Sequence, residues 1–371
     1  MFQEEVNIMV FLYEIVAMTN YCNLKCSYCD WSKEQIKSLS ALEKKTAKQH
    51  LEKTRILSDR LFGEFQLIGY TGGEPLLYKD IVFLLLDIYH DKWVRINTNG
   101  LLIDLEILNR LKSHGKSYLA ISLDGNSFED NRNRFSKNSE FEQVLKNIDL
   151  ALEHGLSVQI MDTINPLNIN KFLDYAHWLS EKYTNFIADG SLIMCAHFIQ
   201  TYGKQRAIPN LEQREYLANR LMLDNVPQII KKVHWHYLRL AKYLLTLSNE
   251  GCTAIDWARC THFIGRNLAT SGDFKTFACG MYGKVEGEQL NINDLNIVNS
   301  FQKTHTEIYN NFLKNDSHGC CITDWNAIDS IINGNIKIKD AQDWFKMFRD
   351  KNIVLWLEQE RERCNKKHLT V

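Results

Sequence analysis

Short runs of apolar residues alternate along this chain with longer stretches in which apolar residues recur at helical spacing. Apolar runs of four to eight residues fit buried strands, and a spacing of three to four residues fits amphipathic helices. Six strand–helix repeats predict a parallel sheet with helical crossovers. The predicted strands are 11–18, 65–70, 93–97, 118–123, 158–163 and 191–198, and the predicted helices between them are 41–59, 81–89, 105–111, 141–153 and 169–179.

Two α/β architectures fit this order of elements. One is a doubly wound Rossmann-type sheet, and the other is a partial barrel. Periodicity does not separate them, because both consist of parallel strands joined by helices. The residues that follow the strands are therefore needed to choose between the two architectures.

Three cysteines follow the first predicted strand closely: Cys22, Cys26 and Cys29. A cubane iron–sulfur cluster needs a ligand on each of four irons, so three thiolates leave one iron open to a small molecule. An open coordination position is typical of catalytic metal sites. The competing interpretation is a zinc site, although zinc knuckles and ribbons favour paired C-x2-C units, and the partner pair is missing here.

The C-x3-C-x2-C spacing, with aromatic Tyr28 before the last cysteine, resembles the signature of the radical S-adenosylmethionine (radical SAM) superfamily. This resemblance implies a partial (βα)6 TIM-like barrel with a [4Fe-4S] cluster at the carboxyl ends of its strands. It further implies that SAM chelates the open iron and is cleaved reductively to a 5′-deoxyadenosyl radical. Tyr28 would then lie against the adenine.

Further motifs at strand ends resemble SAM-binding segments of that family. Gly72, Gly73 and Glu74 follow the second predicted strand and resemble the GGE motif, which holds the SAM amino group. Glycines allow the backbone to approach a ligand closely. The competing interpretation is an ordinary turn, since Gly and Pro cluster in turns.

The next two strands also end in short polar residues. Asn99 follows the third strand in a T-N-G run, and Ser122 and Asp124 follow the fourth in an S-x-D-G run. Both runs resemble family segments near the SAM ribose and methionine carboxylate, although Asn-Gly and Asp-Gly are also favoured turn dipeptides. Either Arg132 or Arg134 is expected to meet the SAM carboxylate, because a guanidinium matches a carboxylate bidentately.

The last third of the chain holds six of the ten cysteines. Cys260 and Cys279 flank a predicted β-hairpin with its turn at residues 271–273, and Cys320 and Cys321 follow about forty residues later. This order resembles the twitch module and the longer SPASM module, which hold auxiliary four-iron clusters. We expect one auxiliary cluster on Cys260, Cys279 and one or both of Cys320 and Cys321.

Several alternatives remain open for this second site. Its hairpin is longer than in the usual SPASM pattern, and Cys320 and Cys321 are adjacent. Cys252 is an alternative fourth ligand, the site can be open to substrate, and four-cysteine zinc sites are also found on hairpins. Packing or a free thiol is the expectation for Cys195 and Cys364, and His234 and His236 are assigned to a helix with no ligand role.

The predicted domains are the radical SAM partial barrel at 5–215, a helical bridge at 216–250, and a twitch/SPASM-like domain of hairpin plus helices at 251–371. A formal charge of −1 gives no electrostatic case for nucleic acid or membranes. No apolar run reaches the length of a transmembrane helix, and the acidic start does not fit a signal peptide. A cytoplasmic enzyme is expected.

The resemblance implies hydrogen abstraction from a peptide or protein, giving a crosslink, thioether, epimerisation or oxidation. A small-molecule dehydrogenase or tailoring enzyme is the alternative, and a zinc-stabilised binding module without redox chemistry is a second one. A flavodoxin- or ferredoxin-type reductant is the expected partner. About ten residues precede the first strand, too few for a leader-binding winged-helix domain, so peptide recognition is expected to rely on a separate leader-binding protein or on the barrel itself. No catalytic side chain is assigned.

Overall fold

The computed structural model describes residues 12–198 with three gaps, and most of the C-terminal segment from 336 to 368 with shorter stretches between. The described residues are 12–16, 21–29, 41–62, 67–198, 209–223, 225–231, 237, 241, 245, 267–270, 276–277, 331–332, 334 and 336–368.

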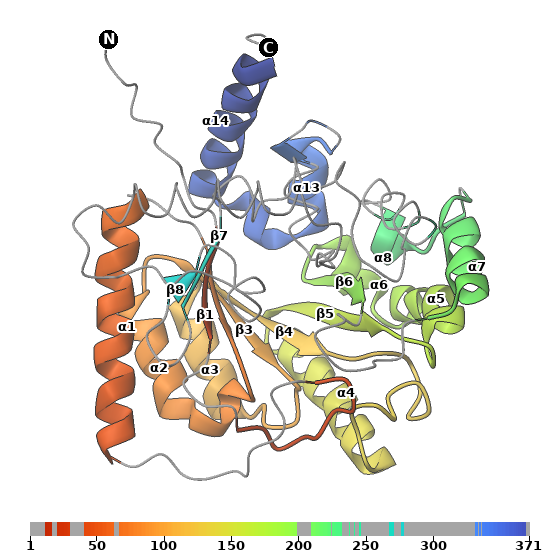
Figure 1. The fold of residues 1–371 in the computed structure, drawn as a ribbon, viewed down its shortest axis with the longest axis horizontal. Coiled ribbons are helices and arrows are strands. Elements are labelled where there is room, and N and C mark those ends of the chain that lie inside the picture. Colours follow the sequence, from red (N-terminus) through yellow and green to blue (C-terminus); the bar gives the residue numbers. More distant parts are fainter. Residues whose placement is uncertain are drawn as a thin grey trace.

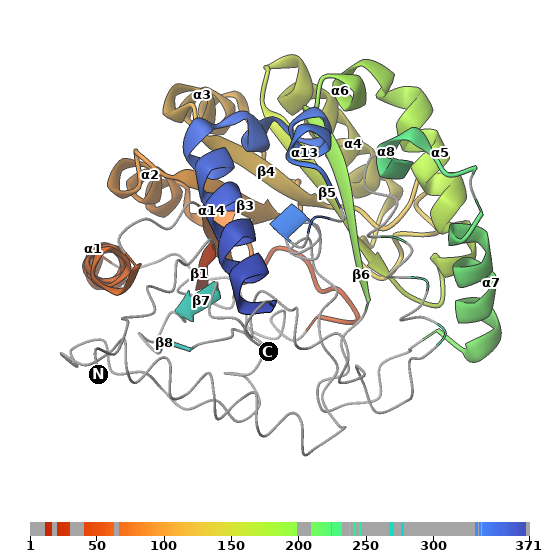
Figure 2. The ribbon, with the colours of Figure 1, turned by 90° about the horizontal axis from the view of Figure 1, so that it is seen from above.

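A curved sheet forms the centre of the described structure (Figures 1 and 2). Its order is β6-β5-β4-β3-β2-β1-β7-β8, and each strand from β1 to β6 lies parallel to the next one along the chain. This sequential parallel order confirms the partial barrel rather than the doubly wound sheet, whose order reverses at a switch point. The six strands are Leu12–Val16, Leu67–Thr71, Trp93–Thr98, Ser117–Ser122, Ser157–Ile164 and Leu192–Phe198.

Helices cover the outer face of this sheet in an arc (Figure 2). The strands beneath them are apolar because the sheet is buried against these helices, so Val94, Ile121 and Ile160 have no exposed surface. The helices are α1 Ala41–Phe62, α2 Lys79–Ile88, α3 Leu105–His114, α4 Asn138–Glu153, α5 Phe172–Lys182, α6 Thr184–Ala188, α7 Leu211–Leu221 and α8 Gln228–Lys231, with 3-10 turns η1 Pro75–Tyr78 and η2 Ile169–Lys171.

The predicted hairpin is present beyond the barrel. Strands β7 Asn267–Thr270 and β8 Thr276–Phe277 pair antiparallel, with Ala269 opposite Phe277. Strand β7 also pairs in parallel with β1, Leu12 lying opposite Asn267. The hairpin therefore extends the barrel sheet at its β1 edge, a pairing between the first and last thirds of the chain that the sequence pattern did not predict.

The C-terminal elements are α13 Ile338–Trp344, η4 Lys346–Arg349 and α14 Lys351–His368. They lie beyond the amino ends of the barrel strands (Figure 1). Asp350 accepts a hydrogen bond from Trp93 Nε1 at 3.0 Å, and the Phe345 ring meets Tyr118 edge-on with centroids 5.0 Å apart. The predicted C-terminal helices are present, and residues 345–350 contact the barrel.

The described part of the chain contains no helix that is both long and apolar enough to cross a membrane.

Candidate active site at the carboxyl edge of the sheet

The cysteine loop follows β1, where the parallel register places the carboxyl ends of the strands on one edge. Cys22, Cys26 and Cys29 are half-buried there and form no disulfide. The backbone N–H of Cys29 donates to the Cys26 carbonyl at 3.1 Å, which closes a tight turn between the second and third cysteines. Loops at this edge carry the active sites of barrel folds.

The thiols of Cys22, Cys26 and Cys29 are the candidate metal ligands at this edge. Among the described residues, no three His, Cys, Asp or Glu side chains converge as a single metal ion would require. A four-iron cluster does not require this, because each thiolate binds a different iron. Burial raises the pKa of Cys22 and of Cys26 to about 11. Both thiols are therefore protonated at neutral pH, and binding iron would release their protons.

Glu74 is buried beside this loop, and hydrogen bonds from neighbouring residues hold its carboxylate in place. Its Oε1 accepts hydrogen bonds from Leu76 N at 3.0 Å and Thr98 Oγ1 at 2.7 Å, and its Oε2 accepts one from Asn99 N at 2.8 Å. Its backbone N–H donates to the Tyr21 carbonyl at 2.8 Å. Burial raises the pKa of Glu74 to about 7 although these hydrogen bonds lower it. Glu74 thus joins the ends of β2 and β3 to the cysteine loop.

These contacts limit what Glu74 can offer to a ligand. A carboxylate has about four lone-pair positions, and three of those on Glu74 are occupied. The predicted contact with the SAM amino group remains a prediction. Gly72 and Gly73 are half-buried, and Gly72 has a φ of 142°, a conformation that side-chain-bearing residues rarely adopt.

Asn99 directs its side chain from the end of β3 toward the first cysteine. Its Nδ2 lies 2.7 Å from Asn23 Oδ1 and 3.8 Å from Cys22 Sγ. Gly100 follows with a φ of 84°, and a Cβ there would lie 2.8 Å from Ile121. The Asn-Gly pair is therefore both a turn and a contact with the cysteine loop, whereas the sequence presented these as alternatives.

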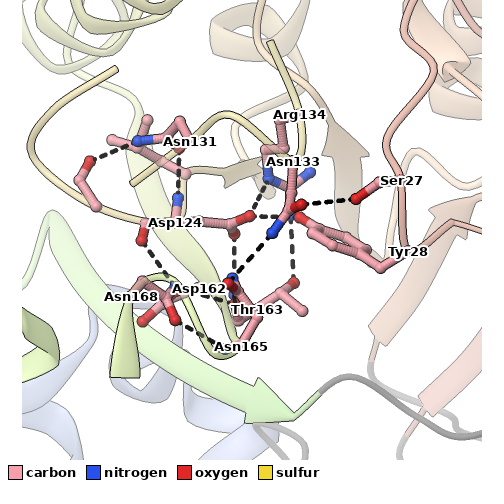
Figure 3. Close-up of polar contacts among 12 residues, drawn as sticks. Ser27, Tyr28, Asp124, Asn131, Asn133, Arg134, Asp162, Thr163, Asn165 and Asn168 are labelled. Atoms are coloured by element: carbon pink, nitrogen blue, oxygen red, sulfur yellow. Dashed lines mark hydrogen bonds and ion pairs between the residues drawn. The ribbon is translucent and has the colours of Figure 1, made fainter. Parts of the chain in front are cut away.

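Asp124 is the centre of a buried polar network at the end of β4 (Figure 3). Tyr28 Oη donates to its Oδ2, and Arg134 Nε pairs with the same oxygen at 2.9 Å. Its Oδ1 accepts from Thr163 N at 3.0 Å, and Asn131 accepts from its backbone N–H at 2.8 Å. The Asp124 side chain has no exposed surface. Three of its about four lone-pair positions are thus occupied, so these contacts limit what Asp124 can offer to ribose.

The structure distinguishes the two candidate arginines. Arg132 is 61% exposed and pairs with Glu129, whereas the Arg134 side chain is 8% exposed and lies 5.4 Å from the Tyr28 ring centroid. Burial lowers the pKa of Arg134, but the charges of Asp124, Tyr28 and Cys26 and the hydrogen bond to Asp124 together raise it above its usual value. The charge of Arg134 also acts to lower the pKa of Cys26. Arg134 is therefore the arginine that lies at the cysteine loop.

Ser122, the last residue of β4, is half-buried next to this network. Residues of β5 and of the loop after it also belong to this site, although none of them was predicted. Thr163 Oγ1 accepts a hydrogen bond from Arg134 Nη2 at 3.2 Å, and Asn168 Nδ2 donates to Asp162 Oδ1 at 3.0 Å and to the Asp124 carbonyl at 2.8 Å. Burial and then the Asp124 charge raise the pKa of Asp162. Their role in the site could have been predicted from their position. Asp162 and Thr163 lie near the end of the fifth strand, as Ser122 and Asp124 lie at the end of the fourth or just after it.

All cysteines of the predicted auxiliary site lie outside the described residues, namely Cys252, Cys260, Cys279, Cys320 and Cys321. The same holds for His234 and His236, for which no ligand role was predicted. Cys195 lies buried on β6, in agreement with the predicted packing role. Cys364 lies within α14, as expected for the terminal helix.

Comparison with protein families and curated proteins gives one consistent relationship. Residues 16–179 match the family model of the radical SAM superfamily. The Fe-coproporphyrin III synthase of Methanosarcina barkeri is 35% identical over 156 residues, which are 41% of this chain and 37% of that protein. The GTP 3′,8-cyclase of Clostridium botulinum strain Okra is 28% identical over 179 residues, 46% of this chain and 53% of the cyclase. The chain thus spans about half or less of these relatives.

Solved structures share the fold over a larger part of the chain. Streptococcus suis SuiB bound to S-adenosylmethionine aligns with a TM-score of 0.54 and 14% identity, over 81% of this chain and 68% of SuiB. Native anSMEcpe with bound AdoMet aligns with a TM-score of 0.56 and 16% identity, over 94% of this chain and 99% of that chain.

Proposed function

Because the chain contains a radical SAM superfamily domain, we propose that this enzyme cleaves SAM reductively and abstracts a hydrogen atom from its substrate. The observation that carries the proposal is the position of the three cysteines. They lie within the matched residues 16–179, on the loop after β1, beside Glu74, Asn99 and Arg134.

Each part of this edge has a role in the proposal. Cys22, Cys26 and Cys29 would hold a [4Fe-4S] cluster, which supplies the electron for SAM cleavage when bound. Arg134 would meet the SAM carboxylate; the support for choosing it is that it is a buried cation at the cysteine loop, whereas Arg132 is exposed. Tyr28 would lie against the adenine, with its hydroxyl fixed by Asp124. Gly72, Gly73, Glu74, Asn99 and Ser122 would line the remaining contacts.

Replacement of the cysteines tests this function directly. We expect Cys22→Ala, Cys26→Ala or Cys29→Ala each to abolish 5′-deoxyadenosine formation from SAM and dithionite, because a cubane that loses one thiolate becomes unstable. Cys195→Ala is the matched control, since Cys195 is buried on β6 away from the loop, and it should retain formation. Undiminished 5′-deoxyadenosine in the triple-alanine protein would disprove the proposal.

The proposed substrate is a peptide or protein. The fold neighbours support this choice: one SuiB structure contains the precursor peptide SuiA, and one anSMEcpe structure contains the Cp18Cys peptide. The names of the curated relatives, GTP 3′,8-cyclase and Fe-coproporphyrin III synthase, favour the small-molecule alternative. Cys- and Ser-containing peptides, GTP and Fe-coproporphyrin III should be compared for stimulation of 5′-deoxyadenosine formation. Stimulation by a small molecule alone would reject the peptide proposal.

An auxiliary cluster on Cys260, Cys279 and the Cys320–Cys321 pair is also part of the proposal. Its structural support is the hairpin β7–β8, which falls between Cys260 and Cys279 in the sequence. The alternative is zinc on the same cysteines. Protein purified without oxygen distinguishes them, because iron–sulfur sites are brown and zinc sites are colourless.

A further inference from the structure

The thiol of Cys22 accepts hydrogen bonds from two N–H groups. Leu24 N lies 3.4 Å from Cys22 Sγ, and Asn99 Nδ2 lies 3.8 Å from it. The first donor belongs to the cysteine loop itself, whereas Asn99 reaches the sulfur from the end of β3, 77 residues away in sequence. We infer that Asn99 is a positioning residue that donates to the Cys22 thiolate and raises the reduction potential of the cluster bound there. The inference rests on the proposed function.

The local structure fixes the orientation of the Asn99 amide. Asn99 Oδ1 accepts a hydrogen bond from Leu101 N at 3.0 Å, and Nδ2 donates to Asn23 Oδ1 at 2.7 Å. Because an amide oxygen cannot donate and an amide nitrogen cannot accept, these partners require Nδ2 to face the cysteine loop. Asn99 N is in turn held by Glu74 Oε2. Asn99 is 7% exposed, so little water competes for the donor.

The sign of the effect follows from charge. One-electron reduction adds negative charge to the cluster and its sulfur ligands. An N–H donor aimed at a ligand sulfur stabilises the more negative reduced form, and hydrogen bonds to sulfur are one of the factors that set cluster potentials. The effect is larger in a buried site than in water, because the local dielectric is low. Removing the Asn99 donor should make reduction harder.

The test is a potential measurement on reconstituted protein. The midpoint potential is read from the EPR signal of the reduced cluster during a dithionite titration without SAM, with Cys260 and Cys279 replaced by Ala to remove the proposed second cluster. We expect Asn99→Ala to shift the midpoint to a more negative value with iron content unchanged. Asn99→Ser should shift it in the same direction, since a serine hydroxyl can still accept from Leu101 N in a turn but is too short to reach Cys22.

Asn133→Ala is the matched control. Asn133 Oδ1 accepts from Ser27 Oγ at 2.7 Å and its Nδ2 donates to Asn165 Oδ1 at 3.2 Å, so this asparagine also holds the cysteine loop, but through partners other than a cysteine sulfur. Its replacement should leave the midpoint at the parental value. An equal shift in the Asn133 and Asn99 variants would overturn the inference, because a general loosening of the loop would explain both.

Two other outcomes separate this inference from the proposed function. If the parent with an intact Cys22, Cys26 and Cys29 set binds no iron, the proposed function itself fails. If the parent forms the cluster and both Asn99 variants keep its iron and its potential, only the inference about Asn99 fails. Loss of iron from both Asn99 variants would also overturn it, because Asn99 would then be needed for holding the cluster.

Discussion

At the scale of single residues, the ion pair between Asp124 and Arg134 is buried, and the one between Glu129 and Arg132 is exposed. The two arginines are separated by one residue, so a buried and an exposed ion pair can be compared within the same segment. An exposed pair is worth at most about 1 kcal/mol. Breaking a buried pair leaves a charge without a partner and costs about 3–5 kcal/mol.

We therefore predict that Asp124→Asn lowers the free energy of unfolding by about 3–5 kcal/mol, because the Arg134 charge would remain buried. Tyr28 would also lose its charged acceptor. Glu129→Gln is the matched control and should change the free energy by less than about 1 kcal/mol. Urea denaturation followed by circular dichroism measures both. If the free energy of unfolding changes by a similarly small amount in the two variants, the contacts of Asp124 with Tyr28 and Arg134 do not stabilise the fold.

At the scale of elements, the apolar runs identified the strands because a parallel sheet covered by helices is buried on its outer face. Strand β4 was predicted at 118–123 and is Ser117–Ser122, and α4 was predicted to begin at 141 and begins at Asn138. The difference at α4 arises because its first turn is polar. Glu140 accepts hydrogen bonds from the backbone of Ser136 and Lys137 at this helix start, which apolar periodicity does not register.

The site was predictable in part for a similar reason. Cysteine spacing and strand-end position are local, so they located the loop at Cys22 and the residues Glu74, Asn99 and Asp124. The partners of those residues depend on three-dimensional contacts. Nothing local in the sequence indicated that Asp124 binds Tyr28 or that Asn99 reaches Cys22, because these pairs are 96 and 77 residues apart.

The contact between η4 and the barrel gives a prediction at this scale. Phe345 is 1% exposed and packs on Tyr118, whereas Leu355 in the adjoining α14 is 54% exposed. Phe345→Ala should lower the free energy of unfolding by about 3–5 kcal/mol, as expected for a large core side chain, and Leu355→Ala by no more than about 0.5 kcal/mol. Thermal or urea denaturation measures both. If Phe345→Ala lowers the free energy of unfolding by no more than Leu355→Ala does, the contact of the C-terminal segment with Tyr118 does not stabilise the barrel.

At the scale of the whole molecule, the cysteine loop and the C-terminal elements lie at different edges of the sheet. The cysteine loop lies at the carboxyl edge of the sheet, and the C-terminal residues Phe345 and Asp350 lie at its amino edge, on Tyr118 and Trp93. The hairpin β7–β8 joins the sheet beside β1. The described parts of the last third of the chain thus contact the barrel through β7 and through the residues between its terminal helices.

The last prediction separates the two proposed clusters by metal content. With Cys22, Cys26 and Cys29 all replaced by Ala, iron and sulfide should remain at roughly one cubane per chain, because Cys260, Cys279 and the Cys320–Cys321 pair are still present. Replacing Cys260 and Cys279 instead should remove a similar amount of iron and leave SAM cleavage by dithionite measurable. Iron and zinc are counted together by plasma mass spectrometry, and sulfide is counted chemically. If the triple-alanine protein contains zinc and only background iron, the auxiliary cluster is disproved while SAM cleavage by the first cluster remains supported, since the two sets of cysteines share no residue.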